Sequence, residues 1–229
     1  MLRKTLLITL LIALMTACAP QATPTAAPAA TDITLTDGLG REIKLAAPAQ
    51  HVVSLAPSNT EILFAIGAGS QVVGRDEFSD YPAEAASIES VGGSMGQYSV
   101  EAIVALKPDL VLAAEINTPE LVKQLEDLGL TVYYLKNPLT LEEMYVNLEI
   151  VGQLTGHDVT ELVDSLKARV AAVDEKIVPL SYMPTVFYEI DATDASKPYS
   201  YGPGTFGDLL IQRAGGANLV TLAGITDSY

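Results

Sequence analysis

Apolar positions along this chain of 229 residues follow two periods, one typical of helices and one of buried strands. Residues 91–114 show the pattern most clearly: a glycine-containing loop, a helix with one apolar face, then a continuous apolar strand. Ser99 is placed to cap the helix, and Pro108 prevents it from continuing. A strand without polar alternation is typical of a parallel sheet covered on both faces. This stretch predicts one loop–helix–strand unit of an α/β fold.

The same order of elements extends to both sides of this unit. Strands and helices alternate with short links from residue 51 to residue 135, which predicts a parallel α/β layer. Ser58 with Glu61 matches a capping box, and Thr118 before Pro119 matches a helix start. The predicted elements are a hairpin over 33–45 about Asp37-Gly38, strands over 51–55, 71–74, 109–114 and 131–135, and helices over 59–68, 100–107 and 119–128.

Residues 139–178 are predicted to be helical over an unusual length. Two apolar stripes follow one another along this segment, and Thr140 with Glu143 matches a capping box at its start. Unbroken, the helix would be ~58 Å long at 1.5 Å per residue. Gly152 and Gly156 indicate a bend or a break partway. A helix of this length between two α/β segments predicts a spacer that joins two lobes.

A second, shorter α/β segment occupies residues 185–229. It contains a strand, a loop that carries Tyr199 and Tyr201, and a helix that ends at a Gly-Gly pair. This segment has 45 residues, whereas the first α/β segment, residues 51–135, has 85. We therefore expect the sequence to be C-terminally truncated and its second lobe to be incomplete.

The first residues of the chain have the features of an export signal. Residues 1–17 contain two basic residues and then an apolar stretch too short to span a bilayer. Small residues before Cys18, the only cysteine, resemble a bacterial lipobox, so we expect Cys18 to be lipidated. An ordinary secretory signal with a chance cysteine is the alternative. Residues 18–32 are rich in Pro, Ala and Thr and predict a flexible tether, with the lipid anchor as the only contact with the membrane.

Charge and histidine content exclude several kinds of partner. The chain has 13 basic and 28 acidic residues, a formal net charge of −15. Such a surface disfavours nucleic acid and polyanionic ligands. The two histidines, His51 and His157, lie in a predicted strand and a polar turn. We therefore expect no histidine-built metal site.

Several motifs in order resemble those of one family. Together with the lipobox and the long helix, they are similar to the iron-siderophore/vitamin B12 class of ABC-transporter substrate-binding proteins, nearest the cobalamin-binding type. The motifs are HVVSLAPSNTEILFAIGAGSQVVG (51–74), FSDYP (78–82), VGGSMGQYSVEAIVALKPDLVLA (91–113) and YGPGTFGDLLIQRAGGANLV (201–220). The resemblance implies two Rossmann-like lobes, at 33–137 and 181–229, joined by a bridging helix over 138–180.

The resemblance also implies a bulky ligand, bound between the lobes without covalent chemistry. A cobalamin or other corrinoid is expected first, with a ferric siderophore or haem as the alternative, because only Arg75 and Lys197 offer cations in the candidate loops. Ligands of open α/β sheets bind at the carboxyl ends of the strands. The candidate ligand-binding residues are Phe78, Tyr81, Ser94, Met95, Tyr98, Tyr199 and Tyr201.

The expected partner is the permease dimer of an ABC importer, with its ATPase. By resemblance, Glu101 is the carboxylate of the first lobe that meets the permease, and its counterpart would lie beyond Tyr229. The protein itself is expected to be an extracytoplasmic monomer with neither catalytic residue nor cofactor.

Three other functions are compatible with parts of the sequence. Gly92 to Gly96 matches the G-x-S-x-G pattern of an esterase, with Ser94 as nucleophile and His157 as the available base. That motif needs a strand directly before the serine and a helix directly after it, and neither is predicted. Gly67-Ala-Gly69 follows a helix and so lacks the context of a dinucleotide site. A purely structural surface lipoprotein is the third alternative.

Overall fold

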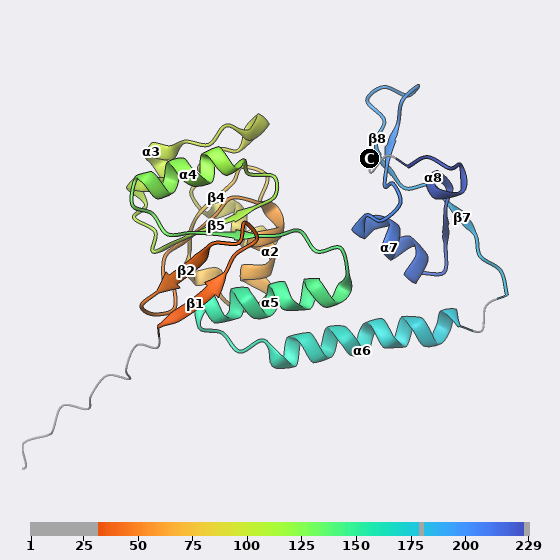
Figure 1. The fold of residues 1–229 in the computed structure, drawn as a ribbon, viewed down its shortest axis with the longest axis horizontal. Helices are drawn as coiled ribbons and strands as arrows, with labels where there is room; N and C mark the ends of the chain where they lie inside the picture. Colours follow the sequence, from red (N-terminus) through yellow and green to blue (C-terminus); the bar gives the residue numbers. More distant parts are fainter. Residues whose placement is uncertain (1–31, 179–180, 227–229) are drawn as a thin grey trace, which may run out of the picture. The chain divides into compact units, whose positions relative to one another are not determined.

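The computed structural model describes residues 32–178 and 181–226 of this α/β protein. The predicted export signal, Cys18 and all of the tether except Asp32 lie outside the described residues. The N-terminal lobe is built on a sheet of four parallel strands in the order β4-β3-β5-β6, which confirms the predicted parallel layer (Figure 1). The strands are β3 (Val52–Ser54), β4 (Val72–Arg75), β5 (Leu110–Ala114) and β6 (Val132–Leu135).

Helices cover both faces of this sheet, as Figure 1 shows. One face packs against α2 (Pro57–Ala65) and α5 (Leu141–Thr155), where Leu63 and Leu148 join the core. The other face packs against α3 (Val100–Ala105) and α4 (Pro119–Asp127). All five side chains of β5 are buried, because this strand has helices on both sides. Short 3₁₀ turns lie at Gly69–Gln71, Ala83–Ser87 and Ser94–Gly96.

Side-chain caps fix the starts of three helices where the sequence predicts them. The hydroxyl oxygens of Ser99, Thr118 and Thr140 accept hydrogen bonds of 3.1–3.2 Å from backbone N–H groups three residues later. The cap predicted at Ser58 is wrong. Helix α2 begins at Pro57 with no side-chain cap, because the fixed φ of proline suits the first helical position and draws Ser58 inside the helix.

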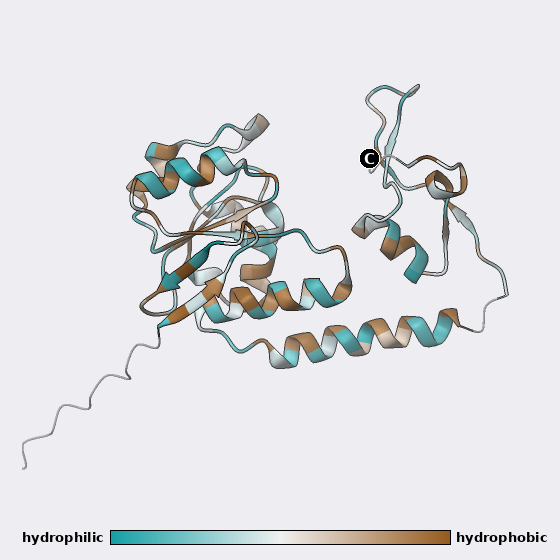
Figure 2. Cartoon of the chain, in the orientation of Figure 1, coloured by the Kyte–Doolittle hydropathy of each residue, from teal (hydrophilic) through white to brown (hydrophobic). Residues whose placement is uncertain are grey.

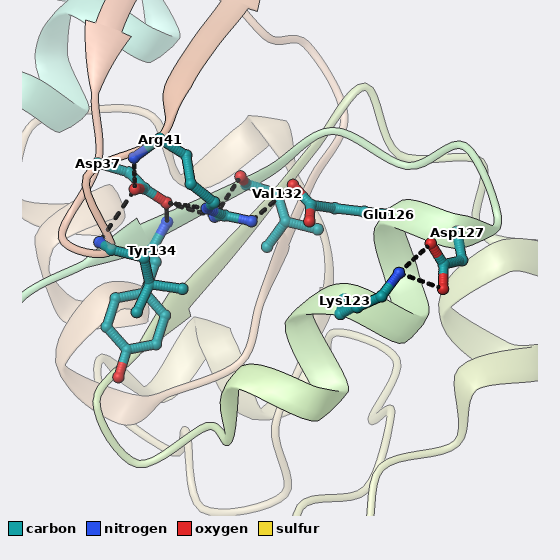
Figure 3. A network of polar contacts seen from close by, with 8 residues as sticks. Asp37, Arg41, Lys123, Glu126, Asp127, Val132 and Tyr134 are labelled. Atoms are coloured by element: carbon teal, nitrogen blue, oxygen red, sulfur yellow. Dashed lines mark hydrogen bonds and ion pairs between the residues drawn. The ribbon is translucent and has the colours of Figure 1, made fainter.

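An N-terminal hairpin attaches to the edge of the sheet. Strands β1 (Ile33–Thr36) and β2 (Glu42–Leu45) pair antiparallel, as predicted. In the turn, Asp37 pairs with Arg41, and Nη1 of Arg41 also lies 2.6 Å from a carboxylate oxygen of Glu126 in α4 (Figure 3). The N–H of Gly38 donates to the carbonyl of Tyr134 in β6 at 2.8 Å. The hairpin is therefore fixed to both β6 and α4.

The predicted long helix is divided in two by Gly156. α5 ends there because Gly156 adopts a left-handed conformation (φ 78°), and α6 (Thr160–Ile177) then begins. Gly152 allows the chain to turn, because a Cβ there would lie 2.7 Å from the carbonyl oxygen of His157. Each helix has brown apolar and teal polar residues on its surface in Figure 2. α5 packs in the N-terminal core, as does Val163 near the start of α6, and α6 then leads to the second lobe.

The second lobe, within residues 181–226, has short strands in two pairs. β7 (Thr185–Val186) pairs parallel with β10 (Ala217–Asn218), and β8 (Glu189–Asp191) pairs antiparallel with β9 (Tyr199–Ser200). The strand predicted over 185–190 is thus two strands in different sheets. Helix α7 (Phe206–Arg213) forms as predicted, capped by Thr205, and α8 (Leu219–Leu222) follows.

Candidate ligand-binding site

The candidate site in the N-terminal lobe lies where the parallel strands end. Ser54 of β3 is in register with Arg75 of β4 and with Leu112 of β5, so the loops that follow these strands leave the sheet at the same edge. Open α/β sheets bind ligands at this edge. The predicted residues Phe78 and Tyr81 lie in the loop after β4, residues 76–82, which we call the aromatic loop.

Buried polar groups hold the start of this loop in place. The carboxylate of Asp76 accepts hydrogen bonds from the backbone N–H of Phe78, at 2.9 Å, and from the hydroxyl of Ser79. The hydroxyl of Thr60 in α2 lies 2.8 Å from those of both Ser79 and Ser54. These four polar side chains are at most 1% exposed, so a buried network of hydrogen bonds holds the start of the loop against the core.

The two aromatic side chains of this loop point away from the core. Phe78 is 59% exposed and Tyr81 is 67% exposed. Exposed aromatic side chains held on an ordered loop can bind an apolar ligand surface at little cost in backbone ordering. Their role in ligand binding stays a prediction.

The glycine loop, residues 92–97, forms a tight turn beside loop 76–82, where the N–H of Glu77 donates to the carbonyl of Gly92 at 2.7 Å. The N–H of Gly93 donates to the carbonyl of Gln97 at 2.7 Å, and Gly92 bridges to Tyr98. Gly93 has φ 119°, and a Cβ there would lie 3.1 Å from the Tyr98 ring, so glycine is required. Ser94 and Met95 lie at the exposed tip, and Met95 is 95% exposed.

Ser94 lacks the setting of a hydrolytic nucleophile. Five residues separate it from Val100, the first residue of α3, so the strand–serine–helix turn of an esterase does not form. The ring of His157 lies against the Gly67 position, after the end of α2, and hydrogen-bonds to Thr155. The serine and the histidine of the esterase alternative therefore lie in separate parts of the lobe.

Tyr98, also a predicted ligand residue, has a structural role. Its hydroxyl donates to the carbonyl of Leu55 at 2.9 Å and accepts from the side-chain amide of Asn117 at 2.8 Å. Burial raises the pKa of Tyr98, although the hydrogen bond from Asn117 acts to lower it. The hydroxyl is thus engaged within the protein, and the half-buried ring is the part that can meet a ligand.

Asn117 is a site residue that the sequence analysis missed. It is 1% exposed, and besides Tyr98 its side chain bonds the carbonyl of Leu55 at 3.1 Å and the N–H of Ala114 at 2.7 Å. It therefore connects the loops after β3 and β5 with the glycine loop. The available sequence signal was an asparagine three residues after the end of a buried strand and directly before a helix cap.

In the second lobe, Tyr199 and Tyr201 have different surroundings. Tyr199 is 55% exposed and lies in β9, not in a loop as predicted, because it pairs with Asp191 of β8. The ring of Tyr201 lies 5.1 Å from that of Tyr188. Both rings line an apolar cavity of about 440 Å³ beside α7.

Buried polar groups also hold the loop that contains Tyr201. Nδ2 of Asn218 donates to the carbonyl of Tyr201 and to the carboxylate of Asp208, each at 2.9 Å. Asp208 also accepts from the N–H of Gly204 at 3.1 Å and from Gln212 at 2.8 Å. Burial opposes ionisation of Asp208, but these bonds outweigh it and lower its pKa.

A larger apolar hollow of about 830 Å³ lies along α2, between α2, α5 and α6. Tyr81 is the only predicted ligand residue that lines it, and Ile62, Met144 and Leu166 contribute apolar walls. The other predicted ligand residues of the N-terminal lobe lie outside it. The hollow therefore does not unite the predicted site.

Glu101, the predicted docking residue, is exposed in the first turn of α3. Cys18, the predicted lipidation site, lies outside the described residues. Across residues 32–178 and 181–226, no helix is both long and apolar enough to cross a membrane. The same residues contain no group of three or more histidine, cysteine or acidic side chains that could hold a metal ion.

Comparison with known proteins identifies the family. A model of the periplasmic binding protein family matches residues 52–228. The uncharacterized ABC transporter substrate-binding lipoprotein YvrC of Bacillus subtilis is 32% identical over 179 residues, which are 76% of this chain and 56% of that protein. A cobalamin-binding protein of Halobacterium salinarum is 31% identical over 201 residues, which are 86% of this chain and 53% of that one.

A solved structure leads to the same family. The crystal structure of a periplasmic heme binding protein from Pseudomonas aeruginosa is similar with a TM-score of 0.64 and 30% identity, over 75% of this chain and 63% of that one. The chain spans about half the length of the curated relatives described above. With its two α/β lobes, its bridging helix and this match over residues 52–228, the chain belongs to the periplasmic binding protein family, whose members bind substrates and are not enzymes.

Proposed function

We propose that this chain is part of the extracytoplasmic binding component of an ABC importer and that its ligand is a corrinoid. The observation that carries the proposal is the pair of exposed aromatic side chains, Phe78 and Tyr81, on an ordered loop at the carboxyl ends of the parallel strands. The flat, largely apolar face of a macrocycle matches such side chains. The Halobacterium relative is a cobalamin-binding protein by name, which supports the same ligand class.

Local charge favours a ligand without many negative groups. Arg75, the cation nearest the aromatic loop in sequence, donates to four backbone carbonyls. The exposed residues on either side of Phe78 include the acidic Glu77 and Asp80. A corrinoid with neutral amide side chains would avoid the repulsion that a carboxylate-rich siderophore would meet here. Haem, with two carboxylates, lies between a corrinoid and a carboxylate-rich siderophore in negative charge and is the second candidate.

The roles of the partners follow from this function. The loaded protein would dock on a permease dimer served by an ATPase, with Glu101 as the contact of the N-terminal lobe, and would act as a monomer. Lipidation at Cys18, after removal of residues 1–17, would hold the domain at the membrane by the tether. We place the lobes at 33–137 and 181–229 and the bridging segment at 138–180.

Thermal unfolding with and without ligands tests the proposed function. The full chain is heated alone and with cyanocobalamin, cobinamide, haem or a ferric siderophore. A ligand at 100 times its Kd adds about 2.7 kcal/mol, which raises Tm by several degrees. We expect a rise with the two corrinoids. A rise with haem or the siderophore alone would refute the corrinoid assignment, and no rise with any ligand would refute ligand binding by this chain.

Single substitutions test whether the ligand binds at the aromatic loop. Phe78→Ala should weaken cyanocobalamin binding about tenfold or more while leaving the Tm of the free protein within a few degrees, because the side chain is 59% exposed. Leu128→Ala is the matched control, since Leu128 is 55% exposed at the end of α4. Equal affinity of the two variants would exclude Phe78 from the site.

A further inference from the structure

Arg75 lies where β4 ends and the aromatic loop begins. Its backbone is fixed on the side away from β3: its N–H donates to the carbonyl of Glu89 at 2.9 Å, and its carbonyl accepts from Val91 at 2.8 Å. The chain thus leaves the sheet at Arg75, carries Phe78 and Tyr81, and returns beside Arg75 about fifteen residues later. The chain segments before and after this loop therefore both lie next to Arg75.

The guanidinium of Arg75 joins the start of this excursion to the 3₁₀ turn Ala83–Ser87 in its second half. On the departing side, Nη1 donates to the carbonyls of Asp76, at 2.9 Å, and Glu77, at 3.2 Å. On the returning side, Nε donates to the carbonyl of Ala85 at 2.9 Å and Nη2 to that of Ala86 at 3.1 Å. A single side chain therefore closes the loop 76–86 at its base.

Arginine is suited to this role, and lysine is not. The guanidinium presents five N–H groups in a rigid plane, so it can reach carbonyls on two sides at once. A lysine ammonium has its three donors on one atom and cannot span the same gap. None of the ion pairs within residues 32–178 and 181–226 involves Arg75, so no carboxylate draws the guanidinium away from the carbonyls.

The aromatic side chains need such support. Phe78 and Tyr81 are mostly exposed, so core packing does not set their positions. Asp76 holds the first part of the loop through its hydrogen bonds with Phe78 and Ser79, but it makes no hydrogen bond to the 3₁₀ turn Ala83–Ser87. The side chain of Arg75 donates hydrogen bonds to both parts of the loop.

We propose that Arg75 is a positioning residue, which holds loop 76–86 closed so that Phe78 and Tyr81 face the ligand, and that it does not itself bind the ligand. The part of this proposal that concerns the ligand rests on the proposed function. The part that concerns the loop does not, so the two are tested by separate measurements.

Amide hydrogen exchange of the full chain tests the loop. The variants are Arg75→Ala and Arg75→Lys, with Arg169→Ala as the control, because Arg169 is an exposed arginine in α6. We expect protection of residues 76–87 to fall about tenfold or more in both Arg75 variants and to be unchanged in the control. Protection of β5 reports whether the fold is intact. Where Arg75→Ala fails to fold, Arg75→Lys decides the outcome.

Chemical rescue separates positioning from a general loss of stability. Methylguanidinium added to Arg75→Ala can occupy the vacated space and should restore most of the protection of residues 76–87. It should have no effect on Arg169→Ala. Unchanged protection of the loop in the Arg75 variants would overturn the proposal.

Cyanocobalamin binding tests the consequence for the ligand. We expect the Kd of Arg75→Ala to rise about tenfold or more and to recover with methylguanidinium. A rise in Kd without loss of loop protection would show that Arg75 contacts the ligand, which also overturns the proposal. If the unsubstituted chain binds no cyanocobalamin, the proposed function fails, and the exchange measurement still decides whether Arg75 closes the loop.

Discussion

Asn117 donates a hydrogen bond of 2.8 Å to the hydroxyl of Tyr98, a residue 19 positions earlier in the chain. Both groups also bond the carbonyl of Leu55, at 3.1 Å from Asn117 and 2.9 Å from Tyr98. Three segments that are distant in sequence thus meet at one buried carbonyl, beside the exposed loops of the candidate site.

Removal of Asn117 should therefore destabilise the N-terminal lobe. Asn117→Ala leaves the buried N–H of Ala114 without its acceptor and should cost about 2–4 kcal/mol in the free energy of unfolding. Tyr98→Phe removes only a hydroxyl and should cost about 1 kcal/mol, since Asn117 keeps its bond to Leu55. Urea unfolding followed by circular dichroism measures both. Asn137→Ala, at an exposed position, should change stability by less than about 0.5 kcal/mol, and a similar value for Asn117→Ala would contradict the prediction.

The two carboxylates that pair with Arg41, those of Asp37 and Glu126, should contribute very unequally to the free energy of unfolding. The Asp37 side chain is fully buried, so Asp37→Ala leaves Arg41 without its buried partner and should cost about 3–5 kcal/mol. Burial alone would lower the pKa of Arg41, but the hydrogen bonds and charge of Asp37 and Glu126 raise it. The Glu126 side chain is 37% exposed, and Glu126→Gln should cost about 1 kcal/mol or less. Equal losses in urea unfolding would refute this asymmetry.

Gly207 should not tolerate a methyl group. A Cβ at this position would lie 2.2 Å from two atoms of the Tyr201 ring, so Gly207→Ala must displace the ring and should destabilise the second lobe by about 1–3 kcal/mol. In Gly207→Ala/Tyr201→Ala the clash is absent. The double variant should lose less stability than the sum of the two single variants, as measured by hydrogen exchange in α7. Additive losses would show that the two residues do not compete for space.

Asp208 should make the second lobe sensitive to acid. Its folded pKa is lowered, since hydrogen bonds from Asn218, Gly204 and Gln212 outweigh the effect of burial. The ionised carboxylate therefore stabilises the fold above its unfolded pKa of about 3.9, and this contribution disappears as the pH falls through the lower folded value. Asp208→Asn should show a smaller fall in Tm between neutral pH and acid below about pH 4 than the unsubstituted chain. Asp164→Asn, at an exposed position, is the control, and its Tm should fall by as much as that of the unsubstituted chain.

The sequence was most informative where structure depends on neighbouring residues. Ser99, Thr118 and Thr140 cap the predicted helices because a cap needs only a hydroxyl and an N–H three residues later. The continuous apolar run at β5 marked a strand buried on both faces. At Ser58 the same rule failed, because Pro57 one residue earlier takes the first helical position.

The contacts that shape the candidate site could not be predicted in this way. The bonds of Asn117 join segments near residues 55, 98 and 117, and their proximity exists only once the sheet has formed. For the same reason, the sequence offers Arg75 as a cation for an anionic ligand, although the fold directs its guanidinium to backbone carbonyls. The sequence predicts a loop at Tyr199, because a two-residue strand such as β9 has no periodic pattern to detect.

The supports of the aromatic and glycine loops have one property in common. Arg75, Asp76 and Asn117 bond mainly to backbone carbonyl and N–H groups, which every amino acid other than proline supplies. Mutations at Phe78, Tyr81, Ser94 or Met95 can therefore accumulate in evolution without disturbing the bonds that hold these loops. If these side chains bind the ligand as proposed, a scaffold of this kind allows ligand preference to diverge between lineages while the lobe that presents them is inherited almost unchanged.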